Sequence, residues 1–98
     1  MLAYVVAAID IVEPTGYDAY RSKVLATVQA HGGRFLVRGG AITVKEGTWP
    51  RARMVVLEFP SRAAAEGWYA SPEYQAILPL RLQAGRGEVV IVDGVPPA

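Results

Sequence analysis

Three segments of the chain are apolar at nearly every position and lack the alternation of a half-exposed strand. They comprise residues 3–9, 54–59 and 89–92. We interpret them as strands of an antiparallel sheet, which usually presents one apolar face to the core and one polar face to water. Because one layer of helices covers one face only, we expect the second apolar face to pack against another copy of the chain.

Residues at spacings of three and four predict a first helix, which residues 13–16 open after they break the strand pattern. The stripe consists of Tyr17, Tyr20, Val24, Val28 and His31. Gly32 and Gly33 end this helix, since glycine readily adopts the left-handed conformation after a last turn.

Two serines mark the starts of further helical segments. Ser61 is suited to cap a helix over residues 62–70, and Ser71 to cap a segment that has Pro72 at its first position. Pro79 is expected to kink or shorten that segment, because proline lacks an amide hydrogen.

The remaining extended segments complete a β-α-β-β-α-β order. They are residues 34–38, 41–45, 53–59 and 88–92. Gly39 and Gly40 bend or bulge the second strand before the run at 41–45, residues 46–50 form a hairpin connection, and residues 95–98 form a loose tail. This order predicts one α+β domain over residues 1–98, a ferredoxin-like fold whose antiparallel sheet has helices on one face.

An ordered set of short motifs resembles a known family over nearly the whole chain. The motifs are Tyr17-x-x-Tyr20, His31-Gly32-Gly33-Arg34, Glu46-Gly47-x-Trp49, Glu58-Phe59-Pro60-Ser61, Ser71-Pro72-Glu73-Tyr74, Arg81 and Val92-Asp93-Gly94. The set is similar to the family called domain of unknown function 1330, within the dimeric α+β-barrel superfamily. The resemblance implies that fold and a homodimer. It implies no reaction, because the family has no established one, and a shared fold does not define a function.

Composition narrows the class of protein further. The 98 residues carry a formal net charge of +1 and no cysteine. This charge gives no electrostatic reason to expect a nucleic-acid or membrane partner, and thiol chemistry is excluded. The N-terminal apolar run ends at Asp10, well short of the roughly 20 residues of a membrane span, and no targeting signal is visible. We therefore expect a soluble cytoplasmic protein.

Side-chain parity gathers the charged residues of the strands on the face away from the helices. This face holds Tyr4, Asp10, Arg34, Arg38 and Glu58 among apolar neighbours. Tyr4, Arg34 and Glu58 are expected at one end, with His31 just above them. Asp10 and Arg38 are expected at the other end, near Tyr17 and Arg53. The pattern predicts a mostly apolar chamber in which a ligand would bind.

Glu58 and His31 are the candidate catalytic residues, and each also has a structural interpretation. Glu58 could serve as a general base or form an ion pair with Arg34. His31 could be a base or an axial ligand of haem, or it could interact with the negative end of the first helix. A single histidine without cysteine does not make a metal site, and we expect neither a metal nor another cofactor.

Six further side chains are candidates for substrate binding: Arg34, Arg38, Tyr4, Asp10, Tyr17 and Trp49. Core packing is the alternative for Tyr17. Trp49 either covers the mouth of a pocket or packs across the dimer.

Two functions remain open at the level of sequence. The first is a cofactor-independent enzyme, of the isomerase or monooxygenase type, that moves a proton of a small apolar or aromatic anion. The second is a non-catalytic, stress-related or small-molecule-binding dimer, in which an Arg34–Glu58 pair fixes the register. An open cavity with convergent polar groups would favour the enzyme.

Overall fold

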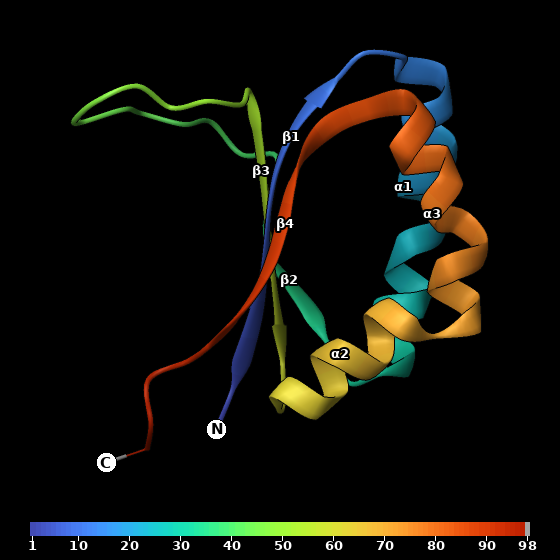
Figure 1. Ribbon diagram of the computed structural model, residues 1–98, viewed down its shortest axis with the longest axis vertical. Helices are drawn as coiled ribbons and strands as arrows, with labels where there is room; N and C mark the ends of the chain where they lie inside the picture. The colour runs from blue at the N-terminus through green and yellow to red at the C-terminus, as the bar shows by residue number, and fades with distance from the viewer. Residues whose placement is uncertain (98) are drawn as a thin grey trace.

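The computed structural model describes residues 1–97, in which three helices cover one face of a four-stranded sheet (Figure 1). The elements are β1 (Ala3–Ile11), α1 (Pro14–Ala30), β2 (Arg34–Arg38), β3 (Arg53–Phe59), α2 (Arg62–Ala70), α3 (Pro72–Ala84) and β4 (Gly85–Asp93). The strand order is β2-β3-β1-β4 and every pairing is antiparallel. The ferredoxin-like α+β fold expected from the sequence is confirmed. Val95, in the predicted tail, is almost fully exposed, while Ala98 lies outside the described residues.

Side-chain caps start all three helices, two of them at the serines that the sequence predicts. The Glu13 carboxylate accepts the amide hydrogen of Gly16, and the Ser61 hydroxyl accepts that of Ala64 at 3.0 Å. The Ser71 hydroxyl does the same for Tyr74 at 3.2 Å. These bonds satisfy amide donors that have no partner inside the first turn of a helix.

Pro79 does not shorten its helix, so that part of the prediction is wrong. Helix α3 continues to Ala84, and β4 starts at the next residue, three positions earlier than expected. Leu78 and Arg81 are buried on either side of Pro79. This packing holds the helix through a position where one backbone hydrogen bond is lost.

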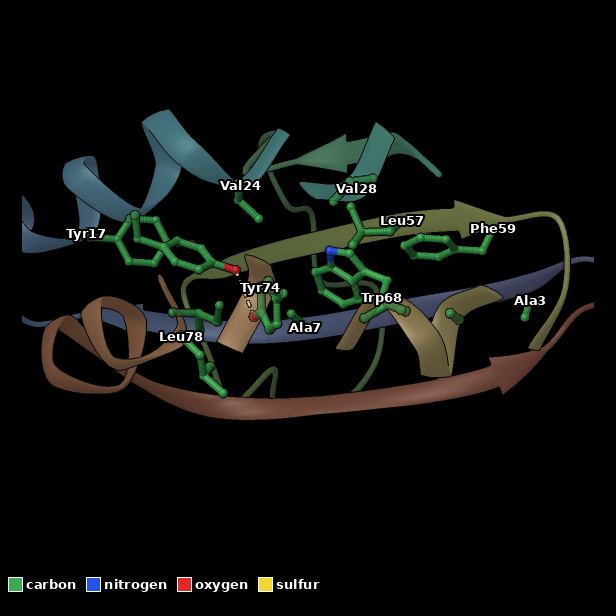
Figure 2. Close-up of a cluster of buried hydrophobic side chains, with 14 of the residues drawn as sticks. Ala3, Ala7, Tyr17, Val24, Val28, Leu57, Phe59, Trp68, Tyr74 and Leu78 are labelled. Carbon is green, nitrogen blue, oxygen red and sulfur yellow. Dashed lines mark hydrogen bonds between the residues drawn. The ribbon is translucent and has the colours of Figure 1, made fainter. Parts of the chain in front are cut away.

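The central strands place their smaller or more apolar side chains toward the helices, as parity predicts. Ala3, Val5, Ala7 and Ile9 are buried in β1, and Leu57 and Phe59 in β3. Figure 2 shows Leu57 and Phe59 packed with Trp68 and Val28 of the helices. Tyr4 and Glu58 are register partners, and they lie on the opposite side, which we call the open face.

A β-bulge places Arg38 on the helix side of the sheet, so the expectation that it lies on the open face is wrong. Arg34 pairs with Glu58, but the register shifts between Phe35 and Val37, and Arg38 then pairs with Val55. The extra residue reverses the alternation beyond it. The bulge lies within β2 and not at Gly39, although the latter does turn the chain, with φ of 74°.

Residues 39–52 form a projecting arm, on the side of the sheet away from the helices (Figure 1). The structure describes all of these residues and assigns none of them to a strand, so the predicted extended run at 41–45 does not join the sheet. Arg51 holds the base of the arm through Glu88, at 2.8 and 3.1 Å, and through Asp10, at 3.1 Å. The amide of Ala52 also donates to Asp10 at 2.8 Å.

Candidate functional site

A small cavity lies between the sheet and the helices. Its volume is about 40 Å³, which is room for a few water molecules. Its wall is largely aromatic and aliphatic, with Tyr17 and Tyr20 from α1, Trp68 from α2 and Tyr74 from α3. Figure 2 shows Tyr17, Tyr74 and Trp68 in this layer. The single chain therefore encloses space on the helix side of the sheet, while the chamber on the open face, which a second copy would close, stays a prediction.

A chain of three polar groups lines the cavity. The hydroxyls of Tyr20 and Tyr74 are 3.0 Å apart, and Arg81 Nε donates to the Tyr74 hydroxyl at 3.4 Å. Tyr74 and Arg81 are seven residues apart on α3, so they share one side of that helix. The hydroxyls of Tyr20 and Tyr74 are close together because α1 packs against α3.

Arg81 is a buried cation without a carboxylate partner. Its residue is 7% exposed, and none of the ion pairs among residues 1–97 involves it. Burial alone would lower the pKa of its guanidinium, but the hydroxyls of Tyr74 and Tyr20 outweigh burial and the pKa is raised. Buried charges are ordinarily paired, so an unpaired one inside a cavity indicates a site for an anion.

Tyr20 supplies a neutral hydroxyl at physiological pH. Burial, assisted by the neighbouring Tyr74, raises the pKa of Tyr20 far above its ordinary value. The titratable side chains among the described residues of the wall are tyrosines and arginines, with no carboxylate or imidazole. The arrangement can therefore stabilise an oxygen anion, but it offers no strong general base.

Three arginines form the boundary between the cavity and solvent, which we call the mouth. Arg21, Arg38 and Arg53 line the cavity and also an outer hollow of about 450 Å³, to which Asp18 and Ser22 contribute.

The guanidinium groups of the mouth rest on aromatic rings. That of Arg38 lies 4.2 Å from the centroid of the Phe35 ring, and that of Arg53 lies 5.4 Å from the centroid of Tyr17. These are distances at which a cation is attracted to the face of an aromatic ring.

Of the residues predicted from sequence, two are part of this site. Tyr17 lines the cavity and Arg38 lines the mouth. The other candidates lie elsewhere. Glu58 forms the expected ion pair with Arg34, at 2.9 Å, on the open face, where Tyr4 is also found. His31 ends α1 as its C-cap residue.

The last two candidates belong to the arm and its attachment. Asp10 is bound to Arg51 and Ala52 at the base of the arm. Trp49, on the arm itself, is 42% exposed.

The sequence reasoning did not assign a function to Arg81, Tyr74, Trp68, Tyr20 or Arg53. Tyrosines on an inner helical stripe look like ordinary core residues. The available signal was Arg81, an arginine two turns after Tyr74 on what must be a buried helix face.

Fold and site together define a small α+β protein of the ferredoxin-like type, with a cavity between its sheet and its helices. The chain belongs to the family named Domain of unknown function (DUF1330), which matches residues 2–95. A search of the curated proteins found no match.

Solved structures share the fold at low sequence identity. The RPA0582 protein of Rhodopseudomonas palustris, of unknown function, is 16% identical with a TM-score of 0.77, over 98% of this chain and 84% of that one. SnoaB of Streptomyces nogalater, a cofactor-independent oxygenase, is 12% identical with a TM-score of 0.64, over 98% and 95% of the chains. An antibiotic biosynthesis monooxygenase is 21% identical with a TM-score of 0.56, over 98% and 100%.

Two further features bear on partners. None of the helices within residues 1–97 combines the length and hydropathy that a bilayer span requires. In the same residues, no three side chains of histidine, aspartate or glutamate are grouped as metal ligands would be.

Proposed function

We propose that the protein is a cofactor-independent enzyme, of the monooxygenase or isomerase type, that acts on a small apolar or aromatic anion in this cavity. One observation carries the proposal: Arg81 is buried in an aromatic-walled cavity, bonded to a tyrosine hydroxyl and unpaired with any carboxylate of residues 1–97. The structural likeness to a cofactor-independent oxygenase supports it.

The residues of the cavity would act on the oxygen of an enol or phenol. Arg81 and the Tyr20–Tyr74 pair stabilise the enolate or phenolate form, and the apolar wall strengthens this interaction by excluding water. The proton leaves to solvent water at the mouth, because the wall holds no carboxylate or imidazole among the described residues.

An oxygenation of this type needs only dioxygen as a second substrate. The enolate carbon of a CH₂ group adjoining a carbonyl adds dioxygen, and the resulting peroxide anion takes up a proton to give a hydroperoxide. Loss of water then leaves a new carbonyl, so one oxygen atom enters the product and the other enters water.

A ligand-binding protein without catalysis is the second candidate. The lack of a general base in the described wall favours it, since proton transfer commonly requires a positioned acid or base.

An enolisable aromatic ketone, 2-tetralone, distinguishes the two. We expect the protein to accelerate exchange of its α-hydrogens for deuterium, followed by NMR, and uptake of dioxygen, followed with an electrode. Arg81→Met and Tyr74→Phe should each lower these rates about 10²-fold, the usual loss for one oxyanion donor. Arg34→Met, on the open face, is the matched control. Binding without exchange or oxygen uptake would establish the second candidate instead.

We also propose that the protein is a homodimer that buries the open face. Exposed apolar side chains on this face include Val37, Val90 and Val92, and Ile42 and Trp49 are exposed on the adjoining arm. In the single chain, no helix covers this side of the sheet (Figure 1).

A further inference from the structure

The mouth carries more positive charge than its own carboxylates neutralise. Asp18 is the one acidic residue of the hollow among residues 1–97, and it pairs with Arg21 at 3.0 Å. None of the ion pairs in the described chain involves Arg38 or Arg53. Two guanidinium groups are thus left at the entrance of an apolar cavity.

Arg53 is held in place with an unused donor. Its Nε is buried and has no hydrogen-bond partner in the described residues. Its guanidinium packs against Gly39, where an added Cβ would lie 2.0 Å from Nη1. A buried donor without a partner is costly, and an anion in the mouth would satisfy it.

Arg38 is held in position by helix α1 and by a neighbouring aromatic ring. Its Nη2 donates to the carbonyl oxygen of Arg21 at 2.8 Å while its plane rests near Phe35. One bond leaves most of its five donors available, and a guanidinium matches the two oxygens of a carboxylate.

We propose that the mouth binds a carboxylate, so that the substrate class is an aromatic hydroxy or keto acid. Its carboxylate would meet Arg38 and Arg53, its ring would enter the cavity, and its enol or phenol oxygen would meet Arg81. The placement of the ring and of the enol or phenol oxygen rests on the proposed function. The carboxylate site at the mouth is argued from Arg38 and Arg53 alone. Entry requires the half-exposed side chain of Arg21 to swing toward the hollow, since the enclosed volume is small.

The alternative is that these arginines only cover the cavity with their aliphatic stems. Isothermal titration with 2-naphthol, 2-naphthoate and 6-hydroxy-2-naphthoate separates the two. We expect the hydroxy acid to bind at least about tenfold more tightly than 2-naphthol, the scale of a charge-assisted hydrogen bond. The double variant Arg38→Gln/Arg53→Gln should reduce this ratio to below about threefold.

Control variants keep the result interpretable. Arg34→Gln should leave the ratio unchanged, because Arg34 lies on the open face. If the double variant is misfolded by circular dichroism, each single variant and Arg38→Lys replace it. Equal affinity for naphthol and the hydroxy acid, or a ratio that survives the arginine substitutions, would overturn the carboxylate site.

The probes also separate this inference from the proposed function. If 2-naphthol binds in a manner that depends on Arg81, and a carboxylate adds no affinity, the inner site is supported and the carboxylate site at the mouth is refuted. If 2-naphthoate binds in a manner that depends on Arg38 and Arg53, and 2-naphthol does not bind, the carboxylate site is supported and the inner site is refuted. Failure of all three probes to bind at millimolar concentration would refute both.

Discussion

At the scale of single residues, the Tyr74 hydroxyl links the two groups that would otherwise be unpaired in the cavity. It contacts the Tyr20 hydroxyl at 3.0 Å and accepts from Arg81 at 3.4 Å. We expect Tyr74→Phe to lower the free energy of unfolding by about 1–3 kcal/mol, because it leaves a buried polar group and a buried cation without this partner. Urea denaturation measures the change. Tyr17→Phe is the control, since no hydrogen bond within residues 1–97 involves its hydroxyl, and an equal loss there would contradict the explanation.

Gly87 is a second residue on which the fold depends, for steric reasons. It is the register partner of Ile9, and a Cβ built on it would lie 1.9 Å from the carbonyl oxygen of Ala8. The clashing atom belongs to the backbone, which cannot move aside as a flexible side chain would. Gly87→Ala should therefore destabilise the protein by roughly 1–3 kcal/mol. Gly40→Ala, where no atom lies within 4 Å and φ is not positive, should be close to neutral. Thermal or urea unfolding of both variants checks the contrast.

At the scale of elements, periodicity and capping residues were enough to predict the helices and the central strands. Those signals are local, and the structure confirms the predicted caps at Ser61 and Ser71. The bulge in β2 was not predictable in the same way. Its position depends on how β2 pairs with β3, and one extra residue was sufficient to move Arg38 from the open face to the mouth.

The arm is attached to the sheet by charges that titrate. The amide of Ala52 and the guanidinium of Arg51 lower the pKa of Asp10, and Arg51 lowers that of Glu88. A lowered pKa in the folded state means that the attachment is complete above the ordinary carboxylate value of about 4. It is lost as the pH falls through the lowered values.

We therefore expect the arm to become mobile in acid and in Arg51→Gln at neutral pH. Heteronuclear NOE values of the amides of residues 41–49 should fall in both cases, while those of β1 stay constant. Arg62→Gln is the matched control, since its partners Glu66 and Asp93 lie away from the arm. An arm equally rigid in Arg51→Gln and in the parent at pH 7 would show that other contacts hold it.

At the scale of the whole molecule, the sheet separates two environments. The sequence predicts a chamber on the open face that a second copy would close, and this stays a prediction. The space that the single chain itself encloses lies on the helix side, where Arg53 and Arg81 reach it from β3 and α3. Which side encloses space depends on how helices pack over a sheet, and no single segment encodes that packing.

We propose that the open face is the surface that a second copy covers. Val90 lies opposite Val6 on this face, midway along the edge strand β4, and is 54% exposed. In a two-fold dimer each substitution occurs twice, and an unpaired lysine inside an interface is strongly unfavourable. We expect the parent to be a dimer and Val90→Lys a monomer by light scattering at micromolar concentration. Leu82→Lys replaces a residue 61% exposed on α3 and should leave the dimer intact. A folded Val90→Lys variant that is still dimeric would place the interface elsewhere, and a monomeric parent would refute the dimer.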